Sequence, residues 1–221
     1  ARGMLEEVCE REGFEVPFLQ IFNVHRGSRP ACARVRDFAV SPGMGRLAAD
    51  LLGVDGVMLY QTCAFYKRPG HGETAWHSDL NTSPFDTNDM ITFWVALTDV
   101  PDRAHSPLEF ASRSHRDFAL PYWYTNQGME RLDSRGYKVT DHSPLWAGDA
   151  TAHHGWVLHG SPPNESGGER KALTVSYVGV GARRLPVRDR RRDADDEDKE
   201  SYMGWCADIG PGQPVKHKLL P

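Results

Sequence analysis

Alternating hydrophobic and polar residues predict three β-strands in this chain. The alternation runs through residues 18–24, 57–66 and 90–98. In an extended segment it places successive side chains on opposite faces of the strand. Such strands hide one face in a core and leave the other face available for a site or for solvent.

The segment at 90–98 has two faces of different character. Ile91 and Phe93 stand on one face, whereas Thr92 and Trp94 stand on the other. We expect the first face to pack the core and the second to line the mouth of a barrel. The segment therefore reads as a central strand.

Helical spacing of apolar residues predicts helices in the first 60 residues, packed outside the main sheet. Met4 and Val8 show this spacing, and Met44 to Leu52 show it again before Gly53 ends the segment. His25 follows the first predicted strand, and we expect it to be an exposed loop residue.

Composition narrows the class of protein. The 221 residues fit one domain, and 26 basic against 30 acidic residues give a net charge of -4, which argues against a nucleic-acid partner.

No run approaches the roughly 20 apolar residues of a membrane span. Four widely spaced cysteines without a Cys-x-x-Cys motif favour a reducing, cytoplasmic setting. Because the sequence begins with Ala1, a preceding targeting segment stays open.

Candidate chemistry begins at His77 and Asp79. Two positions apart on an extended segment, these side chains share a face and can hold one metal ion. Two imidazoles and one carboxylate on one side of a six-coordinate ion leave open positions, which suits Fe(II) that also binds a cosubstrate and oxygen. The pattern predicts a second, distant histidine.

Three histidines compete for that third position. If residues 150–159 are extended, His153 and His159 share a face because they are an even number apart, and His154 points the other way. Strand geometry alone leaves His153 and His159 open.

These stretches resemble the phytanoyl-CoA dioxygenase family of Fe(II)/2-oxoglutarate oxygenases, which includes the ectoine hydroxylases. The resemblance rests on Ala75-Trp76-His77-Ser78-Asp79, on His159-Gly160-Ser161 leading to Arg170, and on Gln61 before Tyr66-Lys67. It covers about residues 57–181. The family pattern selects His159 as the third ligand, beside His77 and Asp79.

The resemblance implies a mainly β fold, a double-stranded β-helix (jelly roll) with flanking N-terminal α-helices. It implies Fe(II), 2-oxoglutarate and O2 as cofactor and cosubstrates, and hydroxylation of a small-molecule C–H bond with release of succinate and CO2. Arg170 would anchor the far carboxylate of 2-oxoglutarate through a two-pronged guanidinium. Gln61 and Thr92 are further candidates for cosubstrate contacts. Asp79 argues against halogenation, because halogenating relatives have a small residue at that position.

Other interpretations remain open at this stage. A non-catalytic binding module on the same barrel, or a zinc-type hydrolase with the same three ligands, also fits the histidines and the carboxylate. A nucleic-acid demethylase fits less well. We expect a single domain over residues 1–221, with a charged loop at 183–200 and a C-terminal tail at 201–221 that folds back over the barrel. The substrate and the oligomeric state do not follow from the sequence.

Overall fold

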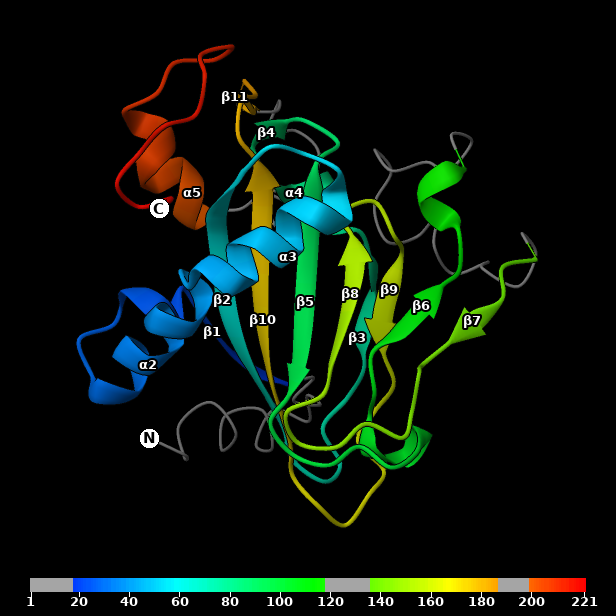
Figure 1. Ribbon diagram of the computed structural model, residues 1–221. Coiled ribbons are helices and arrows are strands. Elements are labelled where there is room, and N and C mark those ends of the chain that lie inside the picture. Colours follow the sequence, from blue (N-terminus) through cyan, green and yellow to red (C-terminus); the bar gives the residue numbers. More distant parts are fainter. Residues whose placement is uncertain (1–17, 118–135, 187–198) are drawn as a thin grey trace, which may run out of the picture.

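The chain folds into two β-sheets that face each other, with helices outside the larger sheet (Figure 1). This computed structural model describes residues 18–117, 136–186 and 199–221. The prediction of a mainly β jelly roll is confirmed. In the described part of the chain no helix is both long and apolar enough to cross a membrane.

The larger sheet has five strands in the spatial order β1-β2-β10-β5-β8, all antiparallel to their neighbours. Its strands are β1 (Leu19–Phe22), β2 (Val57–Lys67), β5 (Met90–Ala96), β8 (Ala150–His154) and β10 (Arg170–Gly179). The predicted strands at 18–24, 57–66 and 90–98 therefore all belong to this sheet. Its register is interrupted once, by an irregularity between Ser176 and Tyr177.

The smaller sheet has four strands in the order β3-β9-β6-β7. They are β3 (Thr74–His77), β6 (Glu109–Ala111), β7 (Val139–Thr140) and β9 (His159–Ser161). A further pair, β4 (Phe85–Asp86) with β11 (Arg183–Arg184), and a short helix, α4 (Asp79–Thr82), lie outside both sheets. The described residues also form 3-10 turns at Val24–Arg26, Arg103–His105, Ser114–Arg116 and Trp205–Ala207.

The two faces of the larger sheet differ as the sequence predicts. Ile91, Phe93 and Val175 are buried in one hydrophobic cluster with Ala39 and Ala48 of the helices. The alternate residues of the same strands point to the space between the sheets. A strand's two-residue period thus gives one face to the core and the other to a cavity.

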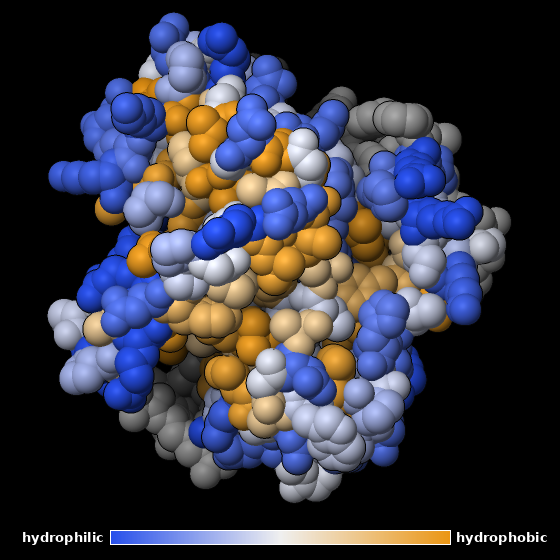
Figure 2. Space-filling view, viewed as in Figure 1, coloured by the Kyte–Doolittle hydropathy of each residue, from blue (hydrophilic) through white to orange (hydrophobic). Residues whose placement is uncertain are grey.

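Two helices cover the outer face, α2 (Pro30–Ala39) and α3 (Pro42–Leu52), and Figure 1 shows α3 lying across the sheet. The side chain of Ser41 caps α3 by accepting from the Met44 amide, and Gly53 ends it with a φ of 72°, which glycine adopts without strain. Figure 2 shows apolar surface on this side of the molecule, to which Leu47 and Leu51 contribute.

The C-terminal segment packs onto the barrel, as expected. After α5 (Lys199–Met203), Trp205 stacks on Phe85 with ring centroids 5.2 Å apart. The carbonyl of Pro221 accepts from the Leu59 amide of β2 at 2.7 Å. Most of the predicted charged loop, residues 187–198, lies outside the described residues, as does the helix expected around Met4 and Val8. The division into one domain stays a prediction.

His25 is buried, contrary to the expectation of an exposed loop residue. Only 3% of it is accessible, because α2 covers the turn that carries it. Its amide donates to the Thr62 hydroxyl at 3.2 Å, and its Nδ1 lies 2.9 Å from the same oxygen. Burial, with Arg26 and Arg36 nearby, lowers the pKa of His25 to about 4.

This burial predicts a loss of stability in mild acid. Between pH 6.5 and pH 4 the unfolded chain binds a proton at His25 that the folded chain refuses, so stability falls as the pH falls. The His25 contribution should reach about 3 kcal/mol at the acid end. Urea unfolding at pH 7 and pH 4 should show a smaller drop for His25→Gln than for the wild type. An equal drop in both proteins would contradict the assignment, and His142→Asn serves as the control.

Candidate metal and cosubstrate site

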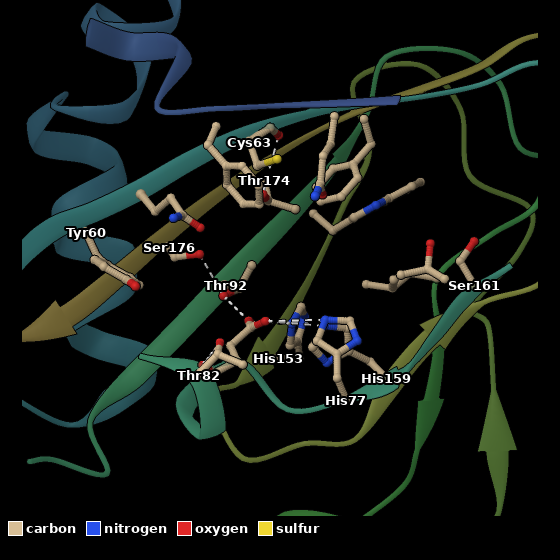
Figure 3. A pocket seen from close by; sticks show the side chains of 18 of the residues that line it. Tyr60, Cys63, His77, Thr82, Thr92, His153, His159, Ser161, Thr174 and Ser176 are labelled. Atoms are coloured by element: carbon tan, nitrogen blue, oxygen red, sulfur yellow. Dashed lines mark hydrogen bonds and ion pairs between the residues drawn. The ribbon is translucent and has the colours of Figure 1, made fainter. Parts of the chain in front are cut away.

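A cavity of about 520 Å³ lies between the two sheets (Figure 3). Alternate residues of β10 and β5 form its floor, among them Thr174, Ser176, Thr92 and Trp94. Residues of the smaller sheet form the opposite wall, and Arg170 is also in the lining. Every residue that the sequence nominated for the site lines this one cavity.

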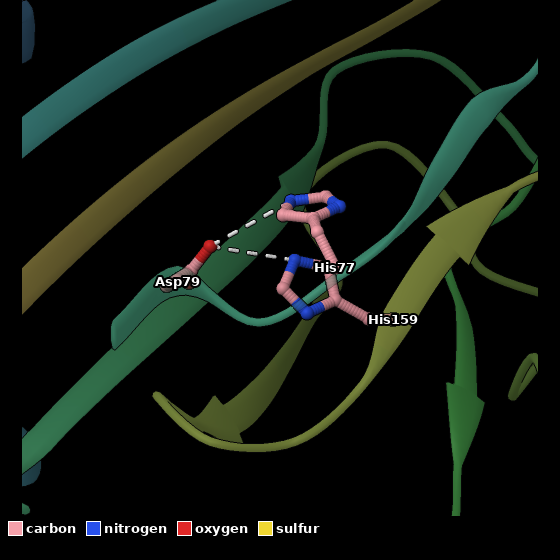
Figure 4. A group of neighbouring side chains, drawn as sticks. All are labelled: His77, Asp79 and His159. Atoms are coloured by element: carbon pink, nitrogen blue, oxygen red, sulfur yellow. Dashed lines mark ion pairs between the residues drawn. The ribbon is translucent and has the colours of Figure 1, made fainter. Parts of the chain in front are cut away.

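His77, Asp79 and His159 converge in the cavity (Figure 4). His77 and His159 are directly paired across β3 and β9, and their ring centroids are 4.2 Å apart. Asp79 opens α4, two residues after His77. One Asp79 oxygen, Oδ1, lies 3.8 Å from Nε2 of His77 and 3.5 Å from Nε2 of His159. One ligand atom from each residue lies within 4.8 Å of the other two.

The backbone fixes which nitrogen each histidine offers. Nδ1 of His77 lies 2.7 Å from the carbonyl oxygen of Ala75, and Nδ1 of His159 lies 3.0 Å from that of Val157. A carbonyl oxygen only accepts, so Nδ1 carries the proton in each ring. Nε2 then presents its lone pair toward Asp79, which is the arrangement that orients histidine as a metal ligand.

The electrostatics favour the protonation states that metal ligands need. Burial opposes ionisation of Asp79, but His159, His153 and His77 outweigh it and hold the pKa of this carboxyl well below its usual range. Burial, with His77 and His153 nearby, holds the pKa of His159 well below its ordinary value. The cluster thus combines an ionised carboxylate with a neutral imidazole. These residues fit a six-coordinate ion with open positions.

The second oxygen of Asp79 is held by the larger sheet. The Thr92 hydroxyl donates to Oδ2 at 2.7 Å and lies 2.9 Å from the Ser176 hydroxyl. Nε2 of His153 is 3.3 Å from the same Oδ2. Ser176, Thr92 and His153 are register partners across β10, β5 and β8, so one row of the sheet supports the carboxylate.

In this structure the side chain of Thr92 contacts Asp79. Its hydroxyl donates its one proton to Asp79, and a contact of Thr92 with a cosubstrate stays a prediction. Gln61 lines the cavity opposite Ser176, beside the same row. Its contact with a cosubstrate stays a prediction.

The structure places the three candidate histidines, His153, His154 and His159, in different surroundings. Residues 150–159 are not one strand, because the chain turns at Gly155 and crosses from β8 to β9. His153 and His159 both still line the cavity. His154 points away from it, and its Nδ1 accepts from the Trp156 amide at 3.1 Å. Parity along the chain gave the correct faces even though the segment is broken.

Arg170 closes one end of the cavity. Its side chain is buried, with Nε donating to the Ser106 carbonyl at 3.0 Å and Nη2 donating to the Ser161 hydroxyl at 3.1 Å. The guanidinium lies 5.6 Å from the Trp94 ring centre. Burial lowers the pKa of Arg170 to about 10, so it stays cationic at neutral pH. Among the described residues no carboxylate pairs with it, which fits an anionic ligand.

Lys67 packs beside Arg170 at this end of the cavity. It was not predicted as a site residue from the sequence. It is paired with Arg170 in register, is fully buried, and donates to the Ser161 carbonyl at 3.3 Å and to the Pro162 carbonyl at 3.0 Å. Burial and then the neighbouring Arg170 lower the pKa of Lys67 to about 7. Both cations contact Ser161, which lies two residues after His159 on the same strand. That two-residue spacing is the feature of the sequence that could have pointed to this part of the site.

Curated relatives carry related names. A protein of Caenorhabditis elegans described as "Probable phytanoyl-CoA dioxygenase" is 26% identical over 173 residues, covering 67% of this chain and 54% of the relative. The bovine "Phytanoyl-CoA dioxygenase, peroxisomal" is 25% identical over 145 residues, covering 59% of this chain and 42% of the relative. The chain thus spans about half the length of the curated relatives it matches.

Solved structures share the fold. The non-heme alpha-ketoglutarate-dependent carbocyclase SnoK from nogalamycin biosynthesis superposes with a TM-score of 0.74 at 23% identity, over 98% of this chain and 83% of SnoK. EctD from S. alaskensis, solved with 2-oxoglutarate and 5-hydroxyectoine, gives a TM-score of 0.63 at 22% identity, over 79% of this chain and 61% of EctD.

The family assignment rests on a match to the sequence pattern described as "Phytanoyl-CoA dioxygenase (PhyH)", which spans residues 11–172. This is well over half of the chain, and it includes His77, Asp79 and His159. The chain belongs to the phytanoyl-CoA dioxygenase family.

Proposed function

We propose that this chain is an Fe(II)- and 2-oxoglutarate-dependent dioxygenase that hydroxylates an unactivated C–H bond of a small molecule. The observation that carries the proposal is that one cavity contains both a two-histidine, one-carboxylate cluster and, at its closed end, a buried arginine without a carboxylate partner among the described residues. A metal-dependent hydrolase that uses only the three ligands would give Arg170 no role. A cosubstrate that bridges the two sites uses both.

The proposed roles follow from this geometry. His77, Asp79 and His159 would hold the iron, and Arg170 would bind the distal carboxylate of 2-oxoglutarate with charge-assisted hydrogen bonds. When bound, the metal and cosubstrate supply the oxidising chemistry, in which O2 gives one oxygen atom to succinate and one to the hydroxylated product, with CO2 released. The family name and the 2-oxoglutarate complex of EctD support this assignment.

The surrounding residues hold this arrangement in place. Thr92 and His153 fix the orientation of Asp79, so that Oδ1 faces both histidines. Lys67 and Ser106 hold Ser161 against Arg170. The site is therefore largely formed before any ligand arrives, which lowers the ordering cost of binding.

Loss of a proposed ligand should stop the reaction. Asp79→Ala and His159→Ala should each lower succinate formation by at least about 1,000-fold, because binding of the metal is lost. His154→Ala, which alters a ring outside the cavity, should retain activity within about tenfold. Succinate release from 2-oxoglutarate, with Fe(II) binding measured anaerobically, checks this. Equal loss in His154→Ala, with activity kept in His159→Ala, would mean that the ligand set is wrong.

Loss of the anchor should weaken cosubstrate binding. Arg170→Leu removes two charge-assisted hydrogen bonds and should raise the KM for 2-oxoglutarate by about 100-fold. Lys171→Leu is the matched control, because Lys171 is exposed and bonds to Glu169. Its KM should change by less than about threefold. Steady-state kinetics with varied 2-oxoglutarate give both values, and equal effects would remove Arg170 from its role.

Loss of the support for Asp79 should weaken metal binding. Thr92→Val removes the hydroxyl that holds Oδ2 and should raise the Fe(II) dissociation constant about tenfold, whereas Thr92→Ser should restore it. Thr98→Val, later in the same segment and outside the cavity, is the control. Anaerobic Fe(II) titration measures this independently of turnover. Unchanged affinity in Thr92→Val would show that the hydrogen bond does not position the ligand.

A further inference from the structure

The cavity has a second region along strands β1 and β2, beside the path from Arg170 to the metal cluster. Figure 3 shows Tyr60 and Ser176 on one side of this cluster and Ser161 on the other. Strand β5, which carries Thr92 beside Asp79, is separated from β1 by β10 and β2, so β1 lies about 14 Å from β5 across the sheet. A cosubstrate held between Arg170 and the metal therefore leaves the second region free for the molecule that is oxidised.

The walls of this region are built by strands β1, β2 and β10. Gln20 and Phe22 come from β1, Tyr60 from β2 and Thr174 from β10. Phe22 is the register partner of Cys63, and Thr174 pairs with Cys63 from the other side. The region therefore combines aromatic rings with amide and hydroxyl groups, all of them uncharged.

Charge is the property that distinguishes the two regions. Histidines aside, Asp79 and Arg170 are the charged residues among the described side chains that line the cavity. In the proposed function Asp79 serves the metal and Arg170 serves the cosubstrate. A divalent ion and a dianionic cosubstrate then balance these two residues, and the loaded site is neutral overall.

Among its described residues this wall offers an ionised substrate no charged partner. Burying an unpaired carboxylate or ammonium costs several kcal/mol, whereas neutral oxygens can exchange water for amide and hydroxyl partners. The CoA part of an acyl-CoA carries phosphates, and beyond Arg170 the described lining offers them no Lys or Arg side chain.

We propose that the second region binds an uncharged substrate with an apolar ring or chain and hydroxyl, carbonyl or ether oxygens. This inference rests on the proposed function and adds the substrate class to it. Phe22 and Tyr60 would pack the apolar part, and Gln20 and Thr174 would meet its oxygens. Zwitterionic amino acids, cyclic amidinium compounds and free fatty acids are then poor substrates.

The test uses three probes with one skeleton and three charges. 2-Tetralol is neutral, tetralin-2-carboxylate is an anion and 2-aminotetralin is a cation at pH 7. Each is titrated anaerobically into the full chain loaded with Fe(II) and 2-oxoglutarate, and the shift of the iron-to-cosubstrate absorption band gives its dissociation constant. We expect the alcohol to bind at least about tenfold more tightly than either ion.

A charge-adding variant tests where the probe lies. Gln20 is exposed at the rim of the wall, so Gln20→Lys should fold normally. It should improve binding of the carboxylate probe relative to the alcohol by up to about fivefold. Lys171→Gln, which alters an exposed side chain outside the cavity, is the control and should alter neither.

The outcomes separate the inference from the function beneath it. If the absorption band and probe-independent succinate formation are absent, the proposed function fails. If both are present, but an ionic probe binds as tightly as the alcohol or no probe binds, the neutral-substrate assignment is wrong and the oxygenase assignment stands. Preference for the alcohol together with the Gln20→Lys effect supports the assignment.

Discussion

The orientation of the Asp79 carboxylate is the constraint on which the rest of this site depends. Its Oδ1 faces the two ring nitrogens of His77 and His159, and its Oδ2 accepts from Thr92. The two oxygens thus join residues of opposite sheets. A rotated carboxylate would lose the hydrogen bond to the larger sheet and would turn Oδ1 away from the histidines of the smaller sheet. The spacing between the two sheets therefore determines the geometry of the site. That spacing is fixed by strand pairing outside the site.

At the end of the cavity that Arg170 closes, two cationic side chains are buried side by side. One of them, Arg170, remains available to bind a ligand. Arg170 and Lys67 are both buried, and neighbouring cations cost free energy in a medium of low dielectric. Lys67 has its hydrogen bonds satisfied by the oxygens of Ser161 and Pro162, and its pKa is lowered to about 7. Arg170 keeps its charge and lines the cavity. A buried cation that is already held in position is a strong binder of carboxylate, because little further ordering is required when the ligand arrives.

Much of this arrangement could be predicted from the sequence. The features that could not be predicted share one cause. His77 and Asp79 follow from a two-residue period, and β5 has the two faces that its alternation indicates. The choice of His159 needed a family pattern, because parity alone left His153 equal to it. The partner of Thr92, the burial of His25 and the role of Lys67 all depend on which strands or helices lie beside them. Register and helix placement are set by contacts between distant segments, so a local pattern does not contain them.

The same register also explains why charge is unevenly distributed in the cavity. On β10 the residues that face the cavity run from Arg170 through Thr174 to Ser176, and each is paired with a neighbouring strand in the same row. The charged residue stands at the end of the strand where Lys67 and Ser161 can surround it, whereas the row beside Asp79 is made of hydroxyl, imidazole and amide groups. A second cation in that row would compete with the metal for the carboxylate, and a second anion would compete with the cosubstrate for the metal. Neutral polar side chains in the middle rows are thus what allows one carboxylate and one guanidinium to act on different ligands within a single cavity.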